Sequence, residues 1–376
     1  MSKTRLLCVG RDFTVGGAER VQLTLLEHLD RDKFDTQIFY LSGQGTFRKL
    51  VPPDVIATYG VQGNESLKLR ALPILVRLIK LARQSDVIFA MQEGTPIYLA
   101  VLAGRLTGRP VVGWAHAPWS EQSKRVGSWH RWALYLYSLT NKLIVTSEGG
   151  SRELVRYYPR LRGKVDAVRN PLPLRHIRTR AGAVLPKWAE QVFAKRTVLS
   201  IGRLEPEKGF DILLPAFAEL VHGRGLDLHL LILGDGEERA RLEELARELK
   251  ISNRVFMPGF QENPYPFFAP AEVFVLSSRW EGLGLVLLEA MALGLPVIST
   301  DCPHGPGEII REARYGLLVP PDNVAALAEA THALLDSAEQ RVALSAAGAT
   351  LVEEYGVSQV RSFEDLLLES ASDKAV

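Results

Sequence analysis

Short apolar runs alternate with longer amphipathic stretches along the first half of the chain. The apolar runs occupy residues 5–10, 36–41, 86–90, 111–115, 142–146 and 164–168. Most of them are separated by stretches with helical periodicity, and the first run is followed by a helix expected at 18–29. Because strands that alternate with helices form a parallel sheet covered by helices on both faces, this half predicts a doubly wound α/β domain.

A second series of the same kind follows. Its apolar runs occupy residues 197–201, 228–233, 254–257, 273–276, 296–299 and 316–319, and helices are expected at 209–221, 237–250, 283–293 and 323–336. Between the two series, the chain is rich in proline and basic residues and lacks periodicity. We therefore expect an N-terminal domain (1–175), a linker (176–193), a C-terminal domain (194–355) and a terminal helical segment (356–376).

The totals agree with a soluble protein of two domains. The 376 residues can form two cores, and 47% of them are hydrophobic and 23% charged. The chain has two cysteines, Cys8 and Cys302, which excludes a disulfide framework. The first residues lack the apolar run of a signal peptide, and no run is long enough to span a membrane. We therefore expect a cytoplasmic protein.

The net charge of +2 conceals an asymmetry. Residues 1–180 contain 28 Lys and Arg against 14 Asp and Glu, whereas residues 181–376 contain 17 against 29. A basic half is attracted to phosphate groups, so we expect peripheral contact with an anionic membrane through the N-terminal domain. The alternative is that the two halves attract each other. No nucleic-acid-binding module is recognisable, and no nucleic-acid partner is expected.

Two carboxylates, Glu281 and Glu289, lie eight residues apart in the segment 277–300. The pattern places Glu281 in the loop after a buried strand, where open α/β sheets bind ligands, and Glu289 inside the next helix. Eight helical residues span roughly 12 Å, about the distance from the sugar to the ribose of a nucleotide sugar. Gly282 and Gly284 would leave the first N–H groups of the helix open to a diphosphate. The alternative is an amphipathic helix with one solvated glutamate at each end.

Three loops of the C-terminal domain also follow strands. The first holds Gly202, Arg203 and Lys208, whose two cations can neutralise a diphosphate. The second is the tight turn at Gly234 and Gly236, where the backbone can approach a nucleotide, although a lone G-x-G is weak evidence. For the third, residues 255–260, a strand followed by a plain turn is nearly as good an interpretation.

The N-terminal domain contributes two candidates at strand ends. Gly16 and Gly17 follow the first strand, and glycines at this turn permit positive φ angles and a close backbone approach to the ligand. His116 comes directly after the strand 111–115. Residues 123–139 interleave basic and aromatic side chains, which suits either a membrane interface or helix packing.

The motif Glu281-x(7)-Glu289, the sequence G-R-L-x(3)-K-G at 202–209 and the sequence D-C-P-H-G-P-G-E at 301–308 together resemble the retaining glycosyltransferases of family 4. The resemblance covers nearly the whole chain and is strongest over 197–320. It implies the GT-B fold, in which two Rossmann-like domains face a central cleft and the last helix crosses back to the first domain. It also implies catalysis without a metal, and no Cys/His cluster has metal-ligand spacing, so no metal or cofactor is expected.

The resemblance implies roles for individual residues. His116 and Glu281 would bind the transferred sugar, and Arg203 and Lys208 would stabilise the leaving diphosphate. The remaining candidates would line the nucleotide-sugar site, with the base held at Phe256 and Met257. These candidates are Gly16, Gly17, Gly202, Gly234, Gly236, Phe256, Met257, Gly282, Leu283, Gly284, Leu285 and Glu289.

The expected reaction moves a hexosyl or N-acetylhexosaminyl unit from a nucleotide diphosphate sugar, with UDP favoured, to an acceptor hydroxyl. The acceptor is expected to be a polyprenyl-diphosphate-linked glycan or a growing surface polysaccharide. Front-face attack is favoured because no well-placed nucleophile stands out. Two alternatives stay open: a nucleotide-sugar 2-epimerase of the same fold, and a non-catalytic protein that binds sugar nucleotides.

Overall fold

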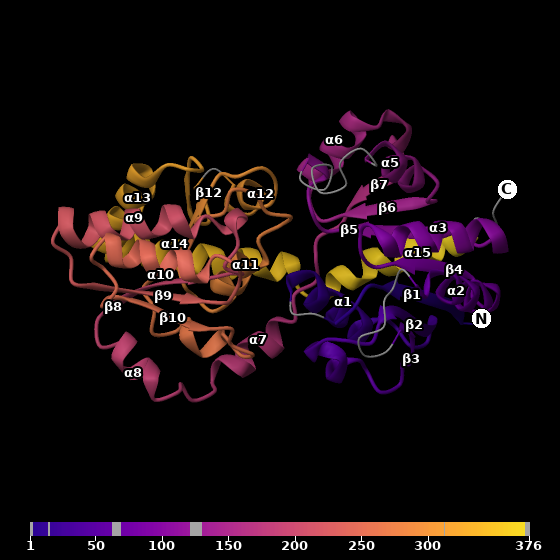
Figure 1. Ribbon diagram of the computed structural model, residues 1–376, viewed down its shortest axis with the longest axis horizontal. Helices are drawn as coiled ribbons and strands as arrows, with labels where there is room; N and C mark the ends of the chain where they lie inside the picture. Colours follow the sequence, from indigo (N-terminus) through magenta and orange to yellow (C-terminus); the bar gives the residue numbers. More distant parts are fainter. Residues whose placement is uncertain (1–2, 14–15, 62–68, 121–129, 312, 373–376) are drawn as a thin grey trace. The chain divides into compact units, whose positions relative to one another are not determined.

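The computed structural model describes residues 3–13, 16–61, 69–120, 130–311 and 313–372. Its contacts divide the chain into two compact units: unit 1 comprises Met1–Leu172 and Tyr355–Val376, and unit 2 comprises Pro173–Glu354. Each unit is built around one parallel sheet (Figure 1). The expected class of fold, two doubly wound α/β domains, is confirmed.

The elements of unit 1 follow in chain order. They are β1 (Thr4–Gly10), α1 (Gly17–His28), β2 (Phe34–Ser42), β3 (Ile56–Val61), α2 (Ala71–Gln84), β4 (Val87–Ala90), α3 (Thr95–Thr107), β5 (Val111–Ala115), α5 (His130–Ser138), β6 (Lys142–Val145), α6 (Glu148–Tyr157), β7 (Val165–Ala167) and α15 (Val360–Ser372). Within the described residues the seven strands take the order β3-β2-β1-β4-β5-β6-β7, all parallel.

Two faces of the unit 1 sheet are covered by different helices. Helices α2, α3 and α5 pack on one face, and their buried residues, including Ile74, Leu78 and Ile97, form a core with the side chains of the strands. Helix α15 packs against β4 and β5, although it is the last element of the chain (Figure 1). Its Phe363 is fully buried and lies near the rings of Phe89 and Trp114.

Unit 2 repeats the plan, and its described residues form six strands in the order β10-β9-β8-β11-β12-β13. Its elements are α7 (Leu174–Ala181), α8 (Trp188–Val192), β8 (Arg196–Ile201), α9 (Phe210–Ala218), β9 (Leu228–Leu233), α10 (Arg239–Glu248), β10 (Val255–Gly259), η6 (Tyr265–Phe267), β11 (Val273–Leu276), α11 (Leu285–Ala292), β12 (Val297–Thr300), α12 (Pro306–Ile310), β13 (Leu317–Val319), α13 (Val324–Asp336) and α14 (Ala338–Leu351).

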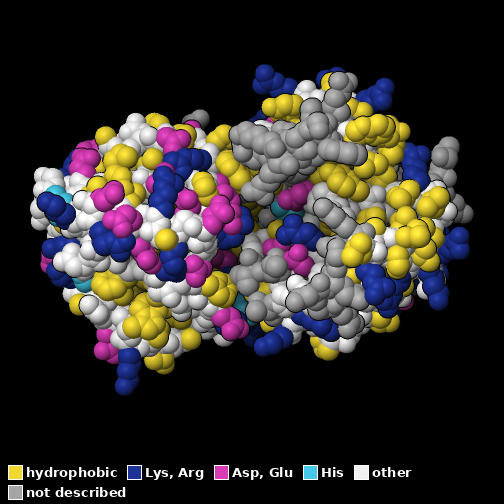
Figure 2. Space-filling model, viewed as in Figure 1, with side chains coloured by type: hydrophobic (Ala, Val, Ile, Leu, Met, Phe, Trp, Pro, Cys, Tyr) yellow, Lys and Arg dark blue, Asp and Glu magenta, His cyan; other side chains and the backbone are white. Residues whose placement is uncertain are grey.

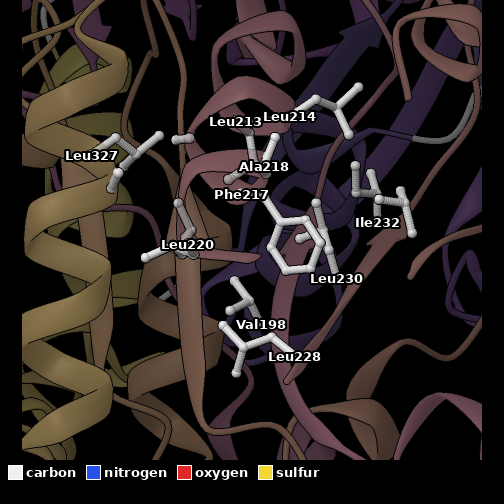
Figure 3. Packing of buried hydrophobic residues seen from close by; sticks show 14 of the residues in the cluster. Val198, Leu213, Leu214, Phe217, Ala218, Leu220, Leu228, Leu230, Ile232 and Leu327 are labelled. Atoms are coloured by element: carbon white, nitrogen blue, oxygen red, sulfur yellow. The ribbon is translucent and has the colours of Figure 1, made fainter. Parts of the chain in front are cut away.

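The core of unit 2 forms where helices α9 and α13 meet the sheet. Phe217 of α9 lies among the leucines and valines of β8 and β9, and Leu327 of α13 approaches from the side (Figure 3). Strands β9, β11 and β12 of this sheet are buried on both faces, as is usual for parallel sheets. This explains why their sequences are short, continuous apolar runs.

Three sequence expectations need correction. The stretch 176–193, expected to be a linker, contains most of α7 and all of α8, whose Ile177, Ala189 and Val192 are buried. Strand β3 was not expected, because it is a half-exposed edge strand with a weak apolar pattern. Helix α14 was not expected either. Its apolar face is narrow, since only Leu344, Gly348 and Leu351 are buried.

Candidate functional site

The order of strands marks one place in each sheet where a ligand is expected. In unit 2 the chain builds outwards from β8 to β10 on one side and from β11 to β13 on the other, so β8 and β11 are neighbours at the topological switch point. Loops that leave these two strands in opposite directions open a crevice at their carboxyl ends. In unit 1 the corresponding neighbours are β1 and β4.

The two switch-point loops of unit 2 are bonded to each other. The Ser277 hydroxyl donates to the Lys208 carbonyl at 2.8 Å, and the Arg279 amide donates to the Glu207 carbonyl at 2.7 Å. Gly209 has a φ of +61°, and a Cβ there would lie 2.1 Å from the Ser277 carbonyl oxygen. Only glycine therefore fits this turn, which fixes where Lys208 lies.

Lys208 and Glu281 form an ion pair across this crevice. The Lys208 Nζ lies 2.6 Å from Glu281 Oε1, and both side chains are largely buried. The Ser278 hydroxyl donates to the same carboxylate oxygen at 2.6 Å. Burial, followed by the nearby charge of Glu281, raises the pKa of Cys302 to about 12. Lys208, predicted to bind the diphosphate, and Glu281, predicted to bind the sugar, thus contact each other. The sequence did not predict this pairing.

Arg203 lies in the same loop as Lys208 but has different partners. Its guanidinium bonds Glu205 at 2.7 Å and Glu207 at 3.0 Å, and about half of its side chain is exposed. Burial alone would raise the pKa of Glu207, but its hydrogen bonding with Glu205 and the charges of Arg203 and Lys208 lower it. The two predicted cations therefore lie at the crevice with carboxylates as their partners.

The structure requires glycine at positions 234 and 236 for a reason that the sequence did not show. A Cβ at Gly234, whose φ is +145°, would lie 1.8 Å from the Gly202 carbonyl oxygen, and one at Gly236 would lie 2.4 Å from the Leu204 carbonyl oxygen. The close backbone approach predicted for a nucleotide is made here to the neighbouring loop. The turn after β9 thus supports the loop that holds Arg203 and Lys208.

Helix α11 begins at Leu285, two residues later than expected. Gly284 precedes it with a φ of +83°, which turns the chain from the Glu281 loop into the helix. Leu283 is buried, and a Cβ at Gly305 would lie 2.4 Å from its carbonyl oxygen, so the loop after β12 supports this turn. Gly282 is partly buried in the same turn. Glu281 therefore lies in the loop and Glu289 in the helix, as predicted.

Glu289 is half-buried and has a partner that the sequence analysis missed. The Tyr265 hydroxyl donates to Glu289 Oε1 at 3.2 Å. Tyr265 belongs to the short helix η6 and is itself buried. The sequence carries no signal for this contact because the two residues are 24 positions apart in different elements.

The strand that holds Phe256 and Met257 is an edge strand with a break in register between Phe256 and Gly259. Phe256 packs edge-on against the His229 ring, and both predicted residues are partly buried. The Met257 carbonyl accepts a hydrogen bond from Arg239 Nη1 at 2.9 Å. Arg239, which the sequence analysis did not single out, also bonds Asp235 and Gly234 and so joins the loops after β9 and β10.

The switch point of unit 1 contains a network of buried polar groups. Gln92, in the loop after β4, donates to Glu19 Oε1 at 2.7 Å and accepts from the Arg11 amide at 3.0 Å. Burial, as the largest cause, raises the pKa of Glu19. The positive φ that glycine permits is not adopted at this turn: Gly16 is extended, with a φ of −164°, and Gly17 starts α1. Glycine is needed at 16 because a Cβ there would lie 2.3 Å from Glu19 Oε2.

His116 lies directly after β5, next to this network. Its Nε2 is 2.9 Å from the Met91 carbonyl oxygen, and its amide donates to Glu93 Oε2 at 2.9 Å. Burial is the largest cause that lowers its pKa, and the ring is therefore neutral, with its proton on Nε2. Nδ1 is buried and has no donor among the described residues.

Part of the basic and aromatic stretch 123–139 lies outside the described residues. This part comprises residues 123–129 and the side chains of His130 and Arg131. In the described part, Trp132 and Tyr135 are exposed and pack edge to face, whereas Tyr137 is buried and its hydroxyl accepts a hydrogen bond from the Gly94 amide. Tyr137 therefore packs inside unit 1, and the membrane interpretation of the stretch stays a prediction.

Within the parts of the chain that the structure describes, no group of three or more His, Cys, Asp or Glu side chains is arranged to hold a metal ion. Asp30 and Asp32 form a D-x-D sequence in the turn before β2, where Asp30 accepts from the Asp32 amide at 2.8 Å. That turn precedes the strand and is not at a carboxyl end. Among the described residues, no helix combines the length and apolar character needed to cross a bilayer.

Comparison with known sequences and structures extends these findings. Residues 15–176 match the family described as Glycosyltransferase Family 4, and residues 189–350 match the family described as Glycosyl transferases group 1. An uncharacterized glycosyltransferase of Methanocaldococcus jannaschii is 34% identical over 177 residues, which are 47% of this chain and 43% of that protein.

Two further proteins match over most of their length. The N-acetylgalactosamine-N,N'-diacetylbacillosaminyl-diphospho-undecaprenol 4-alpha-N-acetylgalactosaminyltransferase of Campylobacter jejuni is 28% identical over 352 residues, covering 87% of this chain and 89% of that protein. The crystal structure of HepE from Anabaena, in complex with UDP and glucose, superposes with a TM-score of 0.84 at 19% identity and covers 98% of this chain and 100% of that chain.

The two sheets with their switch points match the fold of these structures, and the two family matches together account for most of the chain. The chain therefore belongs to the glycosyltransferases of the GT-B fold, with a family 4 N-terminal part and a group 1 C-terminal part.

Proposed function

We propose that this protein is a retaining, metal-independent glycosyltransferase that moves a hexosyl or N-acetylhexosaminyl unit from a UDP-sugar to a lipid-linked glycan acceptor. The observation that carries the proposal is the Lys208–Glu281 pair at the switch point of unit 2. It joins a group that suits a diphosphate to a group that suits sugar hydroxyls. The Campylobacter jejuni and Anabaena proteins, by their names, support an undecaprenol-linked acceptor and a UDP donor.

Leaving-group stabilisation is the main chemical contribution of this site. A diphosphate carries more charge than a single carboxylate, so it can compete for Lys208 with Glu281 and for Arg203 with Glu205 and Glu207. Preorganised cations that meet the charge developing on a leaving group lower the barrier directly. The first N–H groups of α11, beyond Gly284, can add to this stabilisation.

The remaining roles follow from the groups that the ligand would meet. Once Lys208 turns to the diphosphate, Glu281 can accept hydrogen bonds from the sugar hydroxyls, and Glu289, positioned by Tyr265, can accept from the ribose. His116 would accept a sugar hydroxyl at Nδ1. We propose that attack occurs on the front face, with the departing diphosphate taking up the acceptor's proton.

Glu281→Gln tests the assignment with little change in volume. We expect the variant to lose extract-dependent UDP release from a panel of nucleotide sugars by at least about 100-fold, because the amide no longer attracts Lys208 or accepts equally well from hydroxyls. Glu329→Gln, which changes an exposed carboxylate paired with Arg224, serves as the control and should keep full turnover. Turnover retained by Glu281→Gln would show that Glu281 has been misassigned.

The same assay separates the alternative functions. A 2-epimerase would convert the nucleotide sugar to its 2-epimer in the absence of acceptor extract. Adding extract would not increase the amount of UDP released. A non-catalytic binding protein would bind UDP and release none from any donor. Activity that requires added divalent metal and is lost with a chelator would contradict metal independence.

Lys208→Ala tests the diphosphate role by comparing two ligands. We expect UDP to bind about 10-fold to 100-fold more weakly and uridine almost unchanged, because a charged hydrogen bond to phosphate is worth about 1.5–3 kcal/mol. Lys195→Ala removes an exposed cation that pairs with Asp227 in the same unit, and it should leave both affinities unchanged. Equal losses for UDP and uridine would rule out the proposed role.

A further inference from the structure

One face of unit 1 combines exposed apolar side chains with unpaired cations. Helix α3 lies between α2 and α5 and packs against both, so the three helices form a continuous surface over the sheet. Figure 2 shows hydrophobic side chains gathered over these helices, with Lys and Arg side chains among them. We call this surface the α2–α3–α5 face. Its exposed apolar residues are Leu72, Val76, Leu102, Leu106, Trp132 and Tyr135.

The exposed residues of α2 are ordered along the helix. Leu72 and Val76 are 70% and 59% exposed, and the same helical stripe continues with the exposed Lys80 and Arg83. The opposite stripe, with Ile74, Leu78 and Ala82, is buried in the core. The helix is therefore apolar on two sides, and folding alone accounts for only one of them.

The cations of this face differ from those of unit 2. Lys80, Arg83 and Arg105 form no salt bridge with any described residue, although Arg105 raises the local positive charge enough to contribute to the lowered pKa of Lys164, whose main cause is burial. On α10 of unit 2, by contrast, Arg239 and Arg247 each pair with a glutamate of the same helix, and Arg241 pairs with Glu238, the residue just before it. Cations without internal partners are available for external anions.

We propose that the α2–α3–α5 face docks on the surface of an anionic phospholipid bilayer, with its apolar side chains in the headgroup region and its cations on lipid phosphates. A tryptophan and a tyrosine beside leucines and basic residues are the composition of an interfacial surface, and a second protein would not require the row of unpaired cations. This docking rests on the proposed function, because a lipid-linked acceptor lies in a membrane that the enzyme must reach.

The test measures binding of the full chain to vesicles in the absence of any nucleotide sugar. Wild type should cosediment with vesicles of phosphatidylcholine and phosphatidylglycerol in equal parts, but only weakly with phosphatidylcholine alone, and high salt should release it. Val76→Glu should weaken the partition coefficient by about tenfold or more, because it replaces an inserted apolar group with a charge. Val342→Glu on α14 of unit 2, where the valine is 69% exposed, is the matched control and should bind as wild type does.

A second pair of variants tests the cations. Lys80→Gln with Arg83→Gln should weaken binding about fivefold for each charge removed, whereas Arg241→Gln with Arg247→Gln on α10 should not. Equal binding by Val76→Glu and Val342→Glu, or binding of wild type that ignores phosphatidylglycerol, would overturn the proposal. So would a wild-type dimer in solution that Val76→Glu converts to a monomer without any vesicle binding, because the face would then be a contact between two copies.

The result is independent of catalysis. All four variants should keep wild-type affinity for UDP and wild-type circular dichroism, since every changed side chain is exposed and lies outside the candidate site. A protein that binds the anionic vesicles but never releases UDP would refute the proposed function and leave the docking surface intact. A protein that releases UDP but does not bind the vesicles would refute the docking surface and leave the proposed function intact.

Discussion

At the scale of single residues, the candidate site is a set of charges that already have partners. Glu281 holds both Lys208 and Ser278, and Arg203 holds two glutamates. Removing one member of a largely buried pair leaves an uncompensated charge, which costs about 3–5 kcal/mol. We propose that a ligand that supplies the missing charge recovers this energy, so that binding at this site exchanges one partner for another.

The Tyr265 hydroxyl offers a residue-scale prediction. Tyr265→Phe should remove one hydrogen bond that orients Glu289 and should weaken the affinity for UDP about fivefold, while the affinity for 2'-deoxy-UDP should change little. The reason is that only the ribose hydroxyl would be held by the oriented carboxylate. Calorimetric titration with both ligands gives the comparison. If both ligands weaken equally, Tyr265 supports the fold of the site and does not position Glu289.

His116 predicts a dependence on pH. Its pKa in the folded state lies below the ordinary value of 6.5. Just below pH 6.5 the ring therefore binds a proton in the unfolded chain but stays neutral in the folded one. The stability contributed by the neutral ring is complete above pH 6.5 and is lost as the pH falls through that value. The free energy of unfolding of wild type, relative to His116→Gln, should therefore decrease between about pH 7 and about pH 5. A relative increase on acidification would mean that the folded ring is protonated.

At the scale of elements, the site residues follow the ends of strands, and contacts between the loops hold them in place. The turns after β8, β9, β11 and β12 contact one another through backbone atoms, at positions where a side chain would collide. Gly209, Gly234 and Gly305 mark these contacts. A loop held in this way loses little conformational entropy when a ligand binds, which favours affinity.

Two glycines of unit 2 with nearly equal φ angles separate backbone strain from collision. Gly225→Ala, with φ +68° and open space around it, should cost only the left-handed strain of about 1–2 kcal/mol. Gly209→Ala, with φ +61° and the Ser277 carbonyl at 2.1 Å, should cost clearly more and should also weaken UDP, because Lys208 must move. Chemical denaturation and UDP titration of both variants test this. Equal destabilisation with unchanged UDP affinity would contradict the locked loop.

At the scale of the whole molecule, unit 1 is completed by the last helix of the chain. Phe363 and Leu367 of α15 are fully buried, and Glu364 accepts from the Asp30 amide at 2.7 Å and bonds Lys33 at 3.0 Å. The two chain crossings between the units are also joined, since the Leu172 amide donates to the Tyr355 carbonyl at 2.7 Å. Unit 1 therefore needs both ends of the sequence, whereas unit 2 is one continuous segment.

Phe363→Ala should therefore destabilise unit 1 and spare unit 2. We expect a loss of about 3–5 kcal/mol in the unfolding transition of unit 1, because the cavity lies among Phe89 and Trp114. Leu335→Ala, a comparable cavity in the core of unit 2, is the counterpart and should lower only the other transition. Scanning calorimetry of both variants resolves the two transitions. A single transition lowered equally by both changes would show that the units unfold together.

Much of this protein follows from its sequence alone. Continuous apolar runs predict buried parallel strands such as β9 and β11, and for these two strands the observed bounds are the expected ones. The resemblance at Glu281, Glu289 and the 202–209 loop predicted the family and the GT-B fold, because these are local motifs at strand ends. The positions of those residues in loop and helix depend on short-range preferences, which a sequence carries.

The tertiary structure decided what depends on contacts between distant residues. It paired Lys208 with Glu281 across 73 positions, set Tyr265 against Glu289 and brought Gln92 to Glu19. It also showed that Gly16 makes room for a carboxylate and not for a positive φ. The physical reason is that periodicity and motif spacing encode only local geometry, whereas the partner of a charge is set by the order of strands in a sheet.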